Sequence, residues 1–70
     1  MKDPLEKLYQ EIFEDALDYM KKHEVQAVAA TYMAIACRIY KTVLKDEDYL
    51  AMMKVINDTP IEPYNQPTLH

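Results

Sequence analysis

Four carboxylates that share one predicted helix are the residues best suited to do chemistry in this chain. They are spaced at i, i+3, i+4 and i+7, so on a helix each carboxylate lies within reach of the next. They are Glu11, Glu14, Asp15 and Asp18. Hard cations such as Mg²⁺ bind oxygen ligands of this kind. The cluster is therefore the candidate metal site of the sequence.

Glu11 and Glu14 form an E-x-x-E motif. This motif resembles the first half of the E-x-x-E and E-x-x-D signature of the all-α nucleotide pyrophosphatases related to MazG. The resemblance implies helical subunits that oligomerise, with carboxylates on facing helices holding Mg²⁺ against the phosphates of the substrate. It covers only these four positions. The chain departs from the second half of the signature, since Glu47 is followed three residues later by Leu50.

The orientation of the carboxylate cluster predicts a solvated surface. At 100° per residue, its centre lies about 155° from the centre of the apolar stripe on the same helix. Asp18 also has Lys21 and Lys22 at salt-bridge spacing. We therefore expect no bound metal and no cofactor. A Mg²⁺-dependent pyrophosphatase-like enzyme that uses Glu11 and Glu14 stays as the alternative function.

The remaining nucleophilic and acid–base side chains have structural interpretations. A histidine at a helix end, such as His23, is favoured by the helix dipole, and His70 ends a tail, where an organised active site is not expected. Cys37 has no histidine at helical spacing on its own helix to activate it, which favours a packing role. The chain has no serine and no glycine, so serine nucleophiles and glycine-rich phosphate loops are excluded. We predict no catalytic residue, and no enzyme.

Composition and charge exclude further classes of function. Eight basic against twelve acidic residues give a net charge of −4, so the basic surface that nucleic-acid binding requires is not expected. The longest uncharged stretch, residues 25–37, is shorter than the ~20 apolar residues of a membrane span. A single cysteine favours a reducing compartment, and we expect a cytoplasmic protein.

The elements that must position these residues are three helices, expected at residues 4–22, 25–45 and 47–57. Asp3 suits the first N-cap, with Pro4 and Glu6 in the turn that follows. Apolar residues then recur at i, i+3 and i+4. The centre of the stripe after residue 25 is rotated by about 165° from that of the first stripe, which predicts a break near His23. We expect one all-α domain, residues 1–58, with an antiparallel helical hairpin and a short third helix.

The second predicted helix has two apolar faces. Besides its main stripe, a line of small residues allows another helix to approach closely. This line consists of Ala27, Ala30, Ala34 and Cys37. Half of the residues are apolar, whereas a chain of this length hides only about 60% of its unfolded surface. We therefore predict a self-association interface on this line, and a homodimer or higher homo-oligomer that completes a helical bundle.

Residues 59–70 are expected to form an extended tail. Three of the four prolines lie there, and proline disfavours both helix and sheet. Ile61, Tyr64 and Leu69 are the candidate anchors. Docking on its own dimer, docking on an unidentified protein partner and disorder all stay open for this tail.

These patterns favour a non-catalytic function. We expect a small helical protein that acts through protein–protein interaction, by self-association, as a scaffold, adaptor or inhibitor. The sequence predicts no nucleic-acid or membrane partner.

Overall fold

A computed structural model of the chain describes residues 3–65, and this part is all-helical, with three helices and no strand. The all-α class is thereby confirmed. The helices are α1 (Pro4–Lys22), α2 (Val25–Val43) and α3 (Asp46–Asp58). Relative to the ranges expected from the sequence, α2 ends two residues earlier, and α3 is one residue longer at each end. None of the three helices is long and apolar enough to cross a membrane.

Helix α1 begins where its local sequence satisfies the free amides of its first turn. The Asp3 carboxylate accepts a hydrogen bond from the Leu5 backbone N–H at 2.9 Å. Pro4, which has no N–H to satisfy, begins the helix, and Glu6 places a negative charge in the first turn. Lys21 and Lys22 lie in the last turn, where positive charge is favourable.

The two breaks between helices are built from extended residues. His23 and Glu24 separate α1 from α2, and Leu44 and Lys45 separate α2 from α3; all four have β-like or extended dihedral angles. No residue between 3 and 65 has a positive φ. Glycine is favoured where φ is positive, so these breaks form readily in a chain without glycine.

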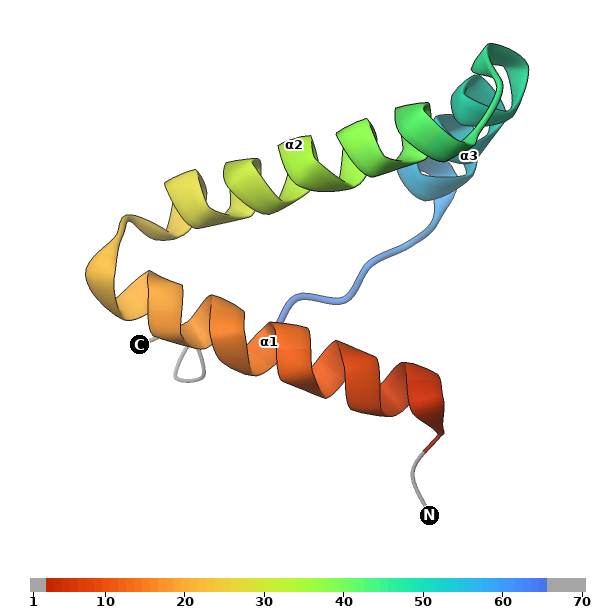
Figure 1. The fold of residues 1–70 in the computed structure, drawn as a ribbon. Helices are drawn as coiled ribbons and strands as arrows, with labels where there is room; N and C mark the ends of the chain where they lie inside the picture. The colour runs from red at the N-terminus through yellow and green to blue at the C-terminus, as the bar shows by residue number, and fades with distance from the viewer. Residues whose placement is uncertain (1–2, 66–70) are drawn as a thin grey trace.

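Helices α1 and α2 meet at the turn and diverge from it, so that together they form a V (Figure 1). Helix α3 folds back against the C-terminal end of α2, and residues 59–65 return from α3 toward α1. At its far end this returning segment places the Tyr64 ring 4.8 Å from the Phe13 ring of α1.

The protein is more open than a compact chain of its size. Its radius of gyration is 14.1 Å, against about 11 Å for a compact chain of this length. Its accessible surface is 6589 Å², against roughly 4,500 Å² expected for a folded monomer of this mass. Among residues 3–65, only Val28 is buried, with 7% of its surface exposed. The fold therefore leaves an unusually large share of its apolar side chains in contact with water.

Candidate functional site

The carboxylate cluster of α1 lies at the surface. Its four members, Glu11, Glu14, Asp15 and Asp18, are all exposed. Glu14 accepts a hydrogen bond from the Gln10 amide at 3.3 Å, and Asp18 pairs with Lys21 at 3.6 Å. Within residues 3–65, no three His, Cys, Asp or Glu side chains are grouped so that they could hold a metal ion.

We expect the double variant Glu11→Gln, Glu14→Gln to melt within a few degrees of the wild type, because surface substitutions of this kind change stability by about 0.5 kcal/mol or less. Adding Mg²⁺ is expected to leave both melting temperatures unchanged. A site that bound Mg²⁺ only in the folded state would raise stability by RT ln(1 + [L]/Kd). Thermal unfolding with Mg²⁺ and with a chelator measures this, and stabilisation of the wild type alone would contradict the prediction.

His23 and Cys37 lie in different parts of the fold. His23 is exposed at the end of α1, and Cys37 is half-buried between α2 and α3. The Cys37 thiol lies 4.0 Å from the Met53 sulfur of α3. Burial raises the pKa of Tyr49, and a hydrogen bond with Cys37 raises it further. These contacts make Cys37 part of the packing between α2 and α3. His70 and Leu69 lie outside the described residues.

The small-residue line on α2 is divided between two environments. Cys37 packs against α3, whereas Ala27, Ala30 and Ala34 are exposed. Because each alanine carries a single methyl group, the three together present little apolar surface. This face is accessible to a partner helix, but most of the exposed apolar area lies elsewhere on the chain.

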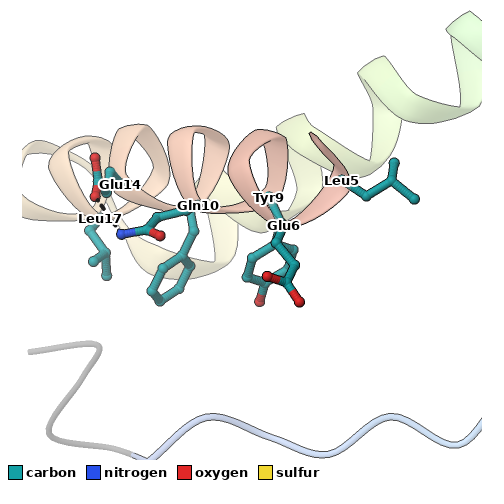
Figure 2. A pocket seen from close by; sticks show the side chains of 7 residues that line it. Leu5, Glu6, Tyr9, Gln10, Glu14 and Leu17 are labelled. Carbon is teal, nitrogen blue, oxygen red and sulfur yellow. Dashed lines mark hydrogen bonds between the residues drawn. The ribbon is translucent and has the colours of Figure 1, made fainter. Parts of the chain in front are cut away.

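A shallow groove follows the side of α1 that carries Phe13. Its volume is about 620 Å³. The residues that line it are Leu5, Glu6, Tyr9, Gln10, Phe13, Glu14 and Leu17. Figure 2 shows these side chains along α1, with the returning segment passing across from them. The groove is thus predominantly apolar, with acidic residues at its edges.

Three aromatic rings connect the groove with the returning segment. Tyr9 stacks on Phe13, with ring centroids 5.9 Å apart, and Tyr64 lies on Phe13 at 4.8 Å. Both distances fall in the range of favourable aromatic pairs. The candidate tail anchor Tyr64 therefore contacts the chain's own first helix. Ile61, another candidate anchor, is exposed.

Sequence reasoning did not identify Phe13 as the residue that receives Tyr64. Phe13 belongs to the apolar stripe of α1, and no local signal distinguishes it from its neighbours as a docking site. The sequence feature that pointed to such a contact was Tyr64, an aromatic side chain within a segment that is expected to be extended.

The described surface of this protein carries exposed apolar side chains from all three helices. Within residues 3–65, fourteen large apolar residues are exposed, among them Leu8, Ile12, Ile35, Ile39 and Val43. Comparisons of the chain with models of known protein families, with curated proteins and with solved structures find no match.

Proposed function

We propose that this chain is a small, non-catalytic helical protein that acts through protein–protein interaction, and that its first partner is a second copy of itself. In this proposal α1 and α2 form the two arms of an antiparallel hairpin, and α3 and an extended, proline-containing tail complete the protomer. Two protomers then complete a helical bundle. Such a dimer would serve as a scaffold, adaptor or inhibitor in the cytoplasm.

The observation that carries the proposal is the excess of exposed surface. The chain exposes about 2,000 Å² more than a compact monomer of its mass. Fourteen exposed large apolar residues within residues 3–65 contribute to this excess, and a soluble monomer rarely exposes contiguous apolar patches above a few hundred Å². Burial of apolar surface is the dominant favourable contribution to association. A partner that covers this surface would therefore stabilise the protein substantially.

The test is the absolute mass of the protein, measured by light scattering after size exclusion over a wide range of concentrations. We expect at least twice the protomer mass of 8.2 kDa, with dissociation only at high dilution. In mild denaturant, we expect helix content, measured by circular dichroism, and mass, measured by light scattering, to fall together. Folding and association bury the same side chains. A mass of 8.2 kDa at every concentration would contradict self-association.

A further inference from the structure

The V formed by α1 and α2 has an apolar lining that is covered near the turn and uncovered toward its open end. On α2, Ile35 follows Val28 by seven residues and Ile39 follows Tyr32 by seven, so each lies two turns further along the same face. Val28 is buried and Tyr32 is half-buried, whereas both isoleucines are exposed. The same face of α2 thus changes from covered to uncovered as the helices diverge (Figure 1).

Helix α1 shows the same change along the face that meets α2. Burial raises the pKa of Tyr32, and the negative charges of Tyr19 and Asp15 raise it further, which places this part of α1 close to α2. Ala16, on the same side, is half-buried. Ile12 and Leu8 lie one and two turns before Ala16 and are exposed.

We call the uncovered part of this lining the mouth. It consists of Leu8, Ile12, Ile35 and Ile39, which are between 46% and 58% exposed.

The rest of the chain covers one flank of the V and leaves the mouth open. Helix α3 packs beside Cys37 through Met53, and the returning segment reaches α1 at Phe13. Phe13 lies about 100° around the helix from Ile12. The mouth residues are about half-exposed with α3 and the returning segment in place. The protomer therefore has no segment of its own, within residues 3–65, that fills the mouth.

The surface that the chain as a whole leaves uncovered has the size that a protein partner buries. An excess of about 2,000 Å² in each chain corresponds to about 4,000 Å² for a pair. Obligate homodimers bury roughly 2,000–5,000 Å² in total, and a standard interface about 1,600 Å². A small ligand covers far less. This excess counts polar and apolar atoms over the whole chain, and two copies that bury part of it against each other reach the area of a stable dimer.

Charge favours contacts between α1 of one copy and α2 of the other. Helix α1 carries five carboxylates and three lysines, a net charge of −2. Helix α2 carries Arg38 and Lys41 and no acidic residue, a net charge of +2. Placing α1 beside the partner's α2 brings opposite charges together, whereas pairing α2 with α2 brings two basic helices together.

From these observations we infer that the mouth of the V receives the arms of a second copy, in an interlocked dimer with two-fold symmetry. The four mouth residues of each chain would then form the shared core. This inference rests on the proposed self-association and specifies its surface, which differs from the alanine line that the sequence pattern indicates.

The test compares one mouth position with one position on the alanine line, by the dissociation constant of the dimer from light scattering and sedimentation. We expect Ile39→Ala to weaken the dimer about 100-fold or more, because both copies lose a buried side chain. Ile39→Lys is expected to abolish it, since a charge would be placed in the shared core. Ala30→Glu, on the exposed alanine line, is expected to change the dissociation constant by about threefold or less.

Ile39→Ala keeps strong helix propensity, so a loss of dimer in this variant is not a failure to form α2, and circular dichroism at high concentration checks this. The inference is overturned if Ile39→Ala and Ile39→Lys dimerise as the wild type does. It is equally overturned if Ala30→Glu dissociates the dimer while Ile39→Ala has no effect; self-association then stands with a different surface. A monomeric wild type would reject the proposed function itself.

Discussion

Replacing Val28 with asparagine is expected to lower the free energy of unfolding by about 3 kcal/mol. Val28 is the buried residue at the closed end of the V. Asparagine there would remove apolar contacts and bury an amide that has no arranged partner. In a chain of this size the loss is a large fraction of the total stability. We expect the melting temperature to fall by about 15 °C or more.

The matched control for this substitution is Val55→Asn. Val55 lies in α3 and is exposed, so the same change costs the same helix propensity without burying an amide. We expect it to shift stability by about 0.5 kcal/mol. Both variants are compared at one protein concentration, because association contributes to the apparent stability. Equal melting temperatures for the two variants would mean that Val28 does not hold the two helices together.

Phe13→Ala is expected to release the returning segment from α1 and to lower the free energy of unfolding by about 2 kcal/mol. The change removes the ring that lies between Tyr9 and Tyr64, together with its half-buried apolar surface. Protease cleavage after Tyr64 is expected to become about 10-fold faster, because local opening governs cleavage of a folded segment. Limited proteolysis followed by mass spectrometry measures the rate.

A double-mutant cycle with Phe13→Leu and Tyr64→Leu isolates the contact between the two rings. We expect a coupling energy of about 1 kcal/mol. Ile61→Ala serves as the control in the same segment, since Ile61 has no ring contact to lose and is 79% exposed, against 46% for Tyr64. The cleavage rate of this variant should match that of the wild type. Zero coupling between Phe13 and Tyr64 would show that the segment is not held by these rings in solution.

These two substitutions address different parts of the same arrangement. Val28 acts where α1 and α2 converge, and Phe13 acts where the returning segment joins α1 to α3. We expect the two contacts together to limit how far the V opens, and so to affect how well the mouth fits a second copy.

The helices themselves could be predicted because their signals are local. The start of α1 follows from Asp3 and Pro4, and the break near His23 from the rotation of the apolar stripe between α1 and α2. Capping and i, i+4 spacing act within one or two turns, so they can be read without knowing the rest of the fold. The all-α class and the three helices follow from these patterns alone.

Only the tertiary structure decided which apolar faces meet and which stay open. The contact of Tyr64 with Phe13 joins residues that lie far apart in the sequence, and the exposure of Ile35 and Ile39 depends on how α1 diverges from α2. The hydrophobic effect is non-directional and roughly proportional to the apolar area buried. A stripe of leucine and isoleucine therefore indicates that a helix face will be buried, but it does not specify which surface packs against it. That choice depends on the packing of the assembled helices, in which shape and distance select among chemically equivalent faces.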